Sequence, residues 1–179
     1  MQNREILIGV TGGIAAYKSA SLVSQLVQAE SSVTVVMTPA ATKFVGPQTF
    51  AALTGKPVAT RTFASRHYPL GAHIELAQRA EVFCIAPASA DCLAKLAGGS
   101  ADELLSAVAL CCTCPILIAP AMNAAMWEKP AVQRNLAQLK KDGFHCIDPQ
   151  EGWLSCRQVG TGRMAEPEKI FAAIQKQLG

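Results

Sequence analysis

The sequence is poor in aromatic and in charged residues. Aromatic side chains make up 6% and charged ones 16% of its 179 residues, whereas half of the residues are hydrophobic. This balance is typical of a well-buried globular chain and argues against disorder. The net charge is only +3, and the lysines and arginines are scattered along the chain. Because nucleic-acid-binding proteins concentrate their basic residues, we expect no nucleic-acid partner.

Long apolar segments are lacking as well. No window reaches the roughly 18 consecutive apolar residues that cross a bilayer. The start of the chain, MQNREILIGVTGG, has no signal-peptide core. These features predict a cytoplasmic protein with no membrane partner, in which cysteines stay reduced.

The cysteines follow neither a metal-binding nor a disulfide pattern. Their number, seven, is odd, and the pair of CxxC or CxxH motifs that a zinc site needs is not found. We therefore expect no metal. We expect these cysteines to be buried as small apolar side chains: Cys84, Cys92, Cys111, Cys112 and Cys146.

Short apolar runs alternate with segments of helical periodicity. The runs predict strands over residues 5–13, 32–40, 80–91, 115–123 and 144–149, and the other segments predict helices over 14–30, 45–55, 131–143 and 166–178. Residues 92–112 fit one or two helices broken near Gly98 and Gly99. Residues 56–63 fit a short edge segment, and residues 64–72 fit an exposed loop.

Apolar strands separated by helices predict a single α/β domain over residues 1–179. Its expected fold is a three-layer, doubly wound (Rossmann-like or flavodoxin-like) arrangement with a mainly parallel sheet. Such folds bind ligands beyond the carboxyl ends of their strands. The small and polar segments at those ends should therefore meet at one crevice: TGGIAAYK, TPAATKF, PASAD, PAMNAAMW and SCRQVGTGRM.

The turn VTGGIAAYKS joins the first predicted strand to the first helix, which favours a phosphate site over glycines that serve only the turn. Tyr17 stands where a P-loop has a glycine, which disfavours ATP hydrolysis. Thr38, rather than an acidic residue, follows the second strand, which weakens but leaves open an NAD site. The remaining interpretation is a mononucleotide such as FMN, near the hydroxyls of Thr38, Ser89 and Ser106.

Seven separated stretches together resemble the homo-oligomeric flavin-containing cysteine decarboxylases. They are GVTGGIAAYK, HIELA, APASAD, LAKLAGG, DELLS, PAMNAAMW and GTGRMAEP, of which PAMNAAMW is the most specific. The resemblance implies FMN as the cofactor and 4'-phosphopantothenoyl-L-cysteine, of coenzyme A biosynthesis, as the substrate. It also implies a homo-oligomer, either a trimer or a dodecamer.

The reaction that this resemblance implies is a decarboxylation made possible by a temporary oxidation. In the family, the flavin oxidises the cysteine thiol of the substrate to a thioaldehyde, and the C=S group accepts the electron pair that CO2 leaves behind. The resulting enethiolate is then reduced by the flavin and protonated, which gives 4'-phosphopantetheine. The protein orients and protonates the substrate, while the cofactor performs the oxidation and the reduction.

The resemblance also implies roles for individual residues. His73 would act as a base or electrostatic partner in thiol oxidation, Asn123 would bind the substrate carboxylate, and Cys156 would donate the final proton. Without the resemblance, a helix cap is the favoured explanation of His73, whereas for Asn123 a capping role and a role in the site are compatible. The implied flavin contacts are Gly12, Gly13, Ile14, Thr38, Phe44, Ser89, Ala90, Asp91, Ser106, Ala121 and Met122.

Arg157 and Arg163 are further candidates for substrate binding. Family members often carry a glycine directly after the active-site cysteine, where this sequence has Arg157. The conformation of that turn is therefore open, and Arg157 either influences the thiol, binds the substrate or does neither.

Other functions also remain open. A peptidyl-cysteine decarboxylase of the same family would not need Cys156 as an acid, and a non-catalytic flavin-binding regulatory subunit would carry an acidic extension. A flavin prenyltransferase fits HIELA and PAMNAAMW poorly. Because the sequence stops at Gly179, we expect the ligase often fused to such domains to be a separate protein or part of a longer chain.

Overall fold

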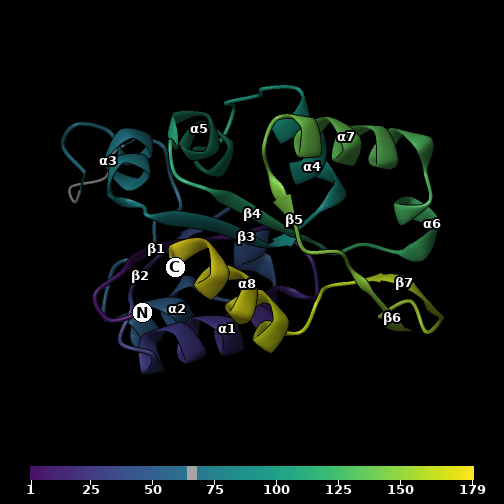
Figure 1. Cartoon of the computed structure of the whole chain (residues 1–179), viewed down its shortest axis with the longest axis horizontal. Helices are drawn as coiled ribbons and strands as arrows, with labels where there is room; N and C mark the ends of the chain where they lie inside the picture. The colour runs from purple at the N-terminus through teal and green to yellow at the C-terminus, as the bar shows by residue number, and fades with distance from the viewer. Residues whose placement is uncertain (64–67) are drawn as a thin grey trace.

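A parallel sheet of five strands forms the middle layer of the molecule, in the order β2-β1-β3-β4-β5 (Figure 1). The structure is a computed structural model that describes residues 1–63 and 68–179. Its strands are β1 (Glu5–Val10), β2 (Ser32–Met37), β3 (Val82–Ala88), β4 (Ile116–Pro120) and β5 (His145–Cys146). All neighbouring pairs are parallel, which confirms the predicted fold class.

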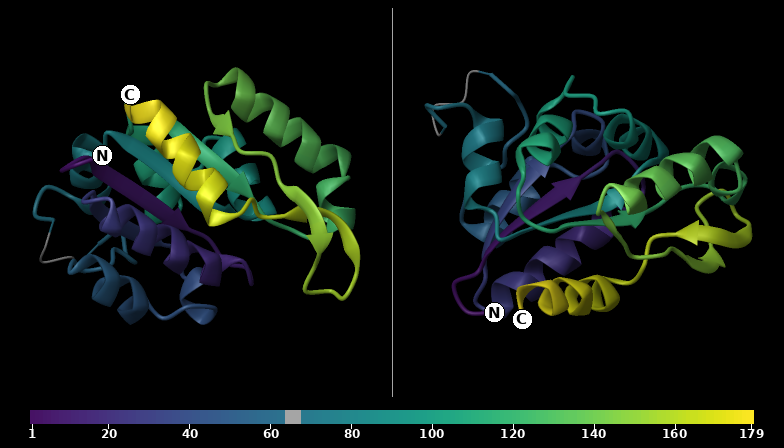
Figure 2. Two further views of the ribbon diagram at one scale, coloured as in Figure 1. Left: turned by 60° about the horizontal axis from the view of Figure 1, so that its bottom comes forward. Right: turned by 45° about the horizontal axis from the view of Figure 1, so that its top comes forward.

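Helices cover both faces of this sheet (Figures 1 and 2). One face packs against α1 (Ala16–Gln28), α2 (Pro47–Thr54) and α8 (Pro167–Leu178), and the other against α3 (Ala72–Arg79), α4 (Ala90–Ala97), α5 (Leu104–Cys111) and α7 (Pro130–Lys141). The single turn α6 (Ala124–Trp127) and the 3-10 turn η1 (Ala41–Lys43) complete the helices of the described residues. Because both faces are covered, β3 is buried along its whole length and β1 is buried from Ile6 to Val10.

The predicted elements are largely confirmed, with differences at the edges of the sheet. Residues 92–112 form two helices, and Gly99 adopts a left-handed conformation (φ 67°) between them. The fifth strand has only two residues, and it pairs with β4 alone. In the predicted edge segment, Ala59 forms a single bridge to Val36. Of the predicted loop at 64–72, residues 64–67 lie outside the described residues, and α3 already begins at Ala72.

An antiparallel hairpin of β6 (Gln150–Trp153) and β7 (Val159–Arg163) was not predicted as strands. It extends away from the main sheet, beside α6 (Figure 1). Its residues are mostly exposed or half-buried and it is rich in glycine, so it lacks the apolar periodicity that predicts strands. The main chain of Met122 fixes it to the sheet, since its N–H donates to the carbonyl of Gly162 at 2.9 Å.

The cysteines are less uniformly buried than expected. Cys84 and Cys92 are buried and Cys112 and Cys146 are half-buried, but Cys111 is exposed, so the prediction for Cys111 is wrong. The reason is that Cys111 is the last residue of α5, where the helix leaves the core. No helix of the described residues is long and apolar enough to cross a membrane. Nor do the described residues contain a group of three or more potential metal ligands.

Candidate active site

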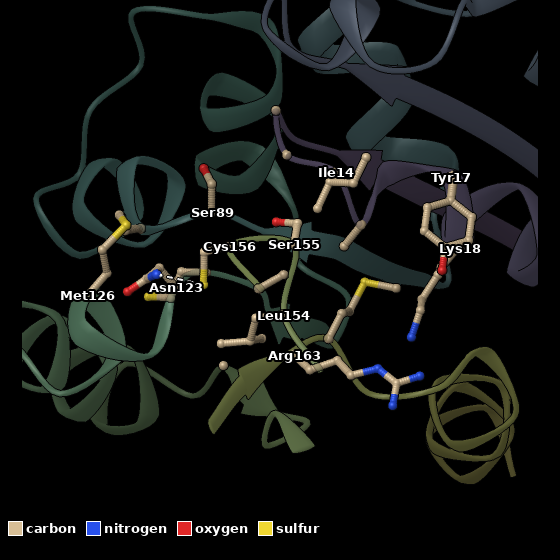
Figure 3. Close-up of a pocket in the computed structure, with 18 of the residues that line it drawn as sticks. Ile14, Tyr17, Lys18, Ser89, Asn123, Met126, Leu154, Ser155, Cys156 and Arg163 are labelled. Atoms are coloured by element: carbon tan, nitrogen blue, oxygen red, sulfur yellow. Dashed lines mark hydrogen bonds between the residues drawn. The ribbon is translucent and has the colours of Figure 1, made fainter. Parts of the chain in front are cut away.

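A cavity of about 440 Å³ opens at the carboxyl ends of the strands. It lies between the neighbouring strands β1 and β3. The helices that follow these two strands cover opposite faces of the sheet. Doubly wound folds usually bind their ligands at such a point. Four segments line it: the β1–α1 turn, the β3–α4 turn, the β4–α6 turn and the hairpin (Figure 3). The lining residues are Gly12, Gly13, Ile14, Ala15, Tyr17, Lys18, Ser89, Ala90, Ala121, Met122, Asn123, Met126, Trp153, Leu154, Ser155, Cys156, Gly162, Arg163 and Met164.

The β1–α1 turn has the properties of an anion site. A Cβ on Gly12 would approach the Cβ of Ala40 to 2.5 Å, so this position requires glycine, whereas Gly13 faces open space. In the described part of the chain, the N–H groups of Gly13 and Ile14 donate to no protein acceptor. These free donors, together with the positive end of the α1 dipole, favour a phosphate.

Two polar side chains fix the neighbouring β3–α4 turn. The hydroxyl of Thr11 donates to the carbonyl of Pro87 at 2.7 Å and accepts from the N–H of Ser89 at 2.9 Å. The hydroxyl of Ser89 in turn caps α4 by accepting from the N–H of Cys92 at 3.2 Å. These bonds hold the two turns against each other and thereby define one wall of the cavity.

Asn123 and Cys156 meet on one side of the cavity (Figure 3). The Oδ1 atom of Asn123 accepts from the N–H of Ala125 at 2.8 Å, which caps α6. Its Nδ2 atom donates to the Sγ of Cys156 at 3.2 Å. The capping role and the predicted role in the site are therefore compatible, because they use different atoms of one amide.

Cys156 is exposed in the tight turn between β6 and β7. Arg157 donates its N–H to the carbonyl of Leu154 at 2.9 Å and has a φ of 64°, in the left-handed region that favours glycine. The turn thus has the backbone conformation of a glycine even though the glycine itself is replaced. Arg157 does not belong to the lining of the cavity, so the structure gives its predicted substrate contact no support.

A charged cluster occupies the other side of the cavity (Figure 3). Lys18 is largely buried, and its Nζ lies 3.0 Å from both carboxylate oxygens of Glu166. Arg163 forms a second ion pair with the same carboxylate. Two cations and one carboxylate leave a positive charge at the cavity. The sequence reasoning missed Lys18, although its place in the first turn of α1, just after the glycines, is a usable signal.

The structure brings ten of the predicted site residues to this cavity. They are Gly12, Gly13, Ile14, Ser89, Ala90, Ala121, Met122, Asn123, Cys156 and Arg163. It also adds an apolar wall that the sequence did not indicate, which includes Trp153 and Leu154 of the hairpin.

Four predicted flavin neighbours lie outside the lining. Thr38 is buried, and its hydroxyl accepts from the N–H of Ala41 at 3.2 Å. Ser106 is buried within α5 and Asp91 forms an ion pair with Lys95 at 3.6 Å. The fourth, Phe44, is exposed. Within one chain these four side chains serve local structure or face solvent.

His73 also lies away from this cavity. It belongs to the first turn of α3, at the opposite end of the molecule from α6 and the hairpin (Figures 1 and 2). Its Nδ1 atom is buried without a hydrogen-bond partner among the described residues. The predicted proximity of His73 to Asn123 and Cys156 is therefore not found within one chain.

The cavity fits a mononucleotide better than a dinucleotide. It offers a single phosphate-binding turn, apolar side chains from three segments, and small residues at the β3–α4 turn that leave room for a ring. Its volume lies at the lower end of the range of small-molecule sites.

Comparison with known proteins agrees with this geometry. Residues 1–179 match the family described as Flavoprotein. A coenzyme A biosynthesis bifunctional protein, CoaBC, of Bacillus subtilis is 46% identical over 176 residues, which are 98% of this chain but 43% of that protein. The chain thus spans less than half the length of this relative.

Solved structures are similar over almost the whole chain. The FMN-dependent cysteine decarboxylase SpaF has a TM-score of 0.83 at 35% identity, covering 99% of this chain and 98% of that one. A PPC decarboxylase mutant complexed with pantothenoylaminoethenethiol has a TM-score of 0.86 at 30% identity, covering 98% of both chains. The chain therefore belongs to the flavoprotein family, in the branch that contains the FMN-dependent cysteine decarboxylases.

Proposed function

We propose that this chain is an FMN-dependent carboxy-lyase that converts 4'-phosphopantothenoyl-L-cysteine into 4'-phosphopantetheine in coenzyme A biosynthesis. The observation that carries the proposal is the contact between Asn123 and Cys156 at the mouth of a mononucleotide-sized cavity. An amide that can bind a carboxylate and a thiol that can give up a proton are two of the groups that this reaction requires of the protein. The similarity to CoaBC and to a PPC decarboxylase supports the same substrate.

FMN would be held mainly by the main chain. The free N–H groups of Gly13 and Ile14 would bind its phosphate, and the β3–α4 turn at Ser89 and Ala90 would face its ring system. When bound, the flavin supplies the two-electron oxidation of the substrate thiol and later returns those electrons.

Asn123 orients the reacting end of the substrate. Because its Oδ1 is engaged with Ala125, its Nδ2 faces the cavity as a donor, which suits a carboxylate and not a cation. The carboxylate leaves as CO2 beside this donor. Cys156, whose Sγ lies 3.2 Å from the same Nδ2, then provides the proton for the carbon that CO2 has left.

Lys18 and Arg163 would bind the phosphate at the far end of the substrate. They lie across the cavity from Asn123 and Cys156 (Figure 3), and both are already ordered by Glu166. An incoming phosphate adds a second anionic partner to this cluster, and bonds between charged groups are among the stronger hydrogen bonds.

The active protein is a homo-oligomer, a trimer or a dodecamer, in this proposal. His73 cannot take part in a site that it does not approach in its own chain, so a second copy would have to provide it. Large apolar side chains that are exposed in the isolated chain support such contacts, among them Ile14, Tyr17, Leu70 and Trp153. Residues 1–179 form one domain of this assembly, and the reduced thiol of Cys156 suits the cytoplasm.

The test of the function is mass analysis of the product. Protein reconstituted with FMN should release CO2 from 4'-phosphopantothenoylcysteine and yield the fully reduced 4'-phosphopantetheine. Cys156→Ser should still release CO2 but should stop at the unsaturated enethiol, because the hydroxyl is a far weaker acid than the thiol. Cys111→Ser, at an exposed cysteine outside the cavity, is the matched control and should give the wild-type product.

Other outcomes of this experiment identify other functions. The 35% identity to the FMN-dependent cysteine decarboxylase SpaF leaves room for a second candidate, decarboxylation of a peptidyl cysteine, in which the wild-type product itself remains the enethiol. A protein that binds FMN but releases no CO2 from either substrate would indicate a regulatory subunit. A protein that binds no FMN would contradict the proposal as a whole.

A further inference from the structure

One carboxylate joins two cations of the candidate active site that come from distant parts of the chain. Glu166 is the N-cap residue of α8, and its side chain makes no capping hydrogen bond. Both of its oxygens lie 3.0 Å from the Nζ of Lys18 in α1, and one of them also forms an ion pair with Arg163 of β7. Lys18 and Arg163 line the cavity (Figure 3), whereas Glu166 is not among the described residues of its lining. Glu166 therefore acts on the cavity through these two side chains.

Lys18 depends on this carboxylate. The side chain of Lys18 is only 10% exposed, and Glu166 is its anionic partner in the described part of the chain. An ammonium group that is withdrawn from water is stable only beside an opposite charge. When no ligand is bound, Glu166 supplies that charge and keeps the ammonium group at the cavity wall.

Arg163 is held by a second constraint besides Glu166. Its side chain lies over Gly152 of the neighbouring strand β6, where a Cβ would approach the guanidinium Nη1 to 3.0 Å and the Cδ to 3.1 Å. The glycine thus leaves the space in which the guanidinium lies. Because Arg163 is held by β6 and Lys18 by its burial, an uncharged side chain in place of Glu166 should leave both cations where they are.

Glu166 has the same sign of charge as the phosphate group that Lys18 and Arg163 are proposed to bind. A phosphate monoester carries about 1.5 to 2 negative charges at neutral pH. When it reaches the two cations, it meets a carboxylate that already neutralises one of them, and like charges a few ångströms apart repel each other. The substrate and the product of the proposed reaction carry the same phosphate. Glu166 should therefore weaken the binding of both to a similar extent.

Such an effect concerns turnover and not the chemical step. Binding energy that is equal for the substrate and the transition state lowers KM without lowering the barrier of the reaction. When the product shares this binding energy, its release becomes slower, and product release limits the rate of many enzymes. A carboxylate beside the phosphate-binding cations offsets part of the shared binding energy.

We propose that Glu166 is a positioning residue that sets the affinity of the cavity for ligands that carry a phosphate. It orders Lys18 and Arg163 when no ligand is bound, and its charge weakens phosphate binding enough for the product to leave. The inference rests on the proposed function, because it takes the phosphate of the substrate to lie at these two cations. It assigns Glu166 no contact with the reacting atoms.

Glu166→Gln tests the proposal, because it removes the charge and retains the size of the side chain. In calorimetric titrations, the FMN-bound variant should bind 4'-phosphopantetheine roughly tenfold more tightly than the wild type does, since like charges a few ångströms apart near a protein surface repel at least that strongly. Pantetheine, which lacks the phosphate, should bind both proteins equally. In turnover, KM for the phosphorylated substrate and kcat should both fall, because the product leaves more slowly. A purely structural role of Glu166 would raise KM instead.

Two further variants separate the charge from the shape of the side chain. Glu166→Asp retains the charge and should bind the product as the wild type does. Glu168→Gln removes a carboxylate from the same end of α8, where its partner is Gln25 at 3.0 Å rather than Lys18. Because Glu168 is not among the described residues that line the cavity, this variant is the matched control and should leave the affinity for the product unchanged.

The outcomes distinguish this inference from the proposed function. If the wild type binds 4'-phosphopantetheine and Glu166→Gln binds it no more tightly, or if Glu166→Asp gains the same affinity, the inference is overturned. If the wild type binds no 4'-phosphopantetheine, the assignment of the substrate fails, and inorganic phosphate becomes the probe. Tighter binding of inorganic phosphate to Glu166→Gln than to the wild type would then still support the role of Glu166, and equal or weaker binding would overturn it.

Discussion

At the scale of single residues, the site depends on polar side chains that stabilise the local structure and also face the cavity. Asn123 caps α6 with one atom and contacts Cys156 with the other. Lys18 is buried against Glu166, yet its charge still borders the cavity. A buried charge is stable only when it is paired. Glu166 therefore allows the charged Lys18 to lie beside the cavity without a bound ligand.

Lys18→Gln tests the proposed phosphate subsite. Hydrogen bonds that involve charged groups contribute about 1.5–3 kcal/mol, which corresponds to a rise of roughly 10- to 100-fold in KM. We expect this rise with the phosphorylated substrate and little change with pantothenoylcysteine, which lacks the phosphate. Lys43→Gln, at an exposed lysine outside the cavity, should leave both values unchanged. Equal losses with the two substrates would mean that Lys18 supports the fold rather than the phosphate.

At the scale of elements, the hairpin is the segment that carries Cys156 to the site. Its contact with the sheet is narrow: Gly162 lies directly against Met122, and a Cβ on Gly162 would approach the Met122 carbonyl oxygen to 2.4 Å. Gly162 also has a φ of 132°, which disfavours other residues. The distance between Cys156 and Asn123 therefore depends on this glycine.

Gly162→Ala should displace the hairpin and separate Cys156 from Asn123. We expect a lower kcat for the formation of reduced product and faster proteolysis within residues 150–163, while the unfolding temperature of the sheet changes little. Gly55→Ala provides the comparison, because Gly55 has a positive φ of 68° but open space around its Cβ position. If Gly162→Ala and Gly55→Ala lower kcat and speed proteolysis equally, the backbone strain at a positive φ explains the loss, and the contact between Gly162 and Met122 does not.

At the scale of the whole molecule, the position of His73 is the strongest reason to expect shared sites. Within one chain, α3 and the hairpin lie at opposite ends of the sheet (Figure 2). If a catalytic site combines His73 of one copy with Asn123 and Cys156 of another, the two groups can be inactivated on separate chains.

Co-expression of His73→Ala and Asn123→Ala chains tests this arrangement. Each variant alone should be inactive, whereas randomly mixed closed oligomers should contain intact sites in about a quarter of their interfaces, with activity in proportion. The measurement is the rate of CO2 release per bound FMN in the purified mixed oligomer. Mixed oligomers no more active than their parents, or a monomer in light scattering, would rule out shared sites.

The amino-acid sequence alone was enough to predict the layer architecture and the segments that line the cavity. Strands that are buried on both faces must be continuously apolar, and the turns after them must be small and polar, so both are readable from local patterns. The glycine turn at Gly12 and Gly13, the β3–α4 turn at Ser89 and the β4–α6 turn at Asn123 were all located in this way.

Which of these side chains lie close together depends on how the elements pack, which the sequence patterns did not show. The hairpin strands are short and exposed, so their pairing arises from contact with Met122 and leaves no periodic signal. The ion pair between Lys18 and Glu166 joins α1 to a residue 148 positions later in the chain, and the separation of His73 from Cys156 follows from how α3 packs on the sheet. Such relations depend on distances between elements, which local propensity and periodicity do not encode.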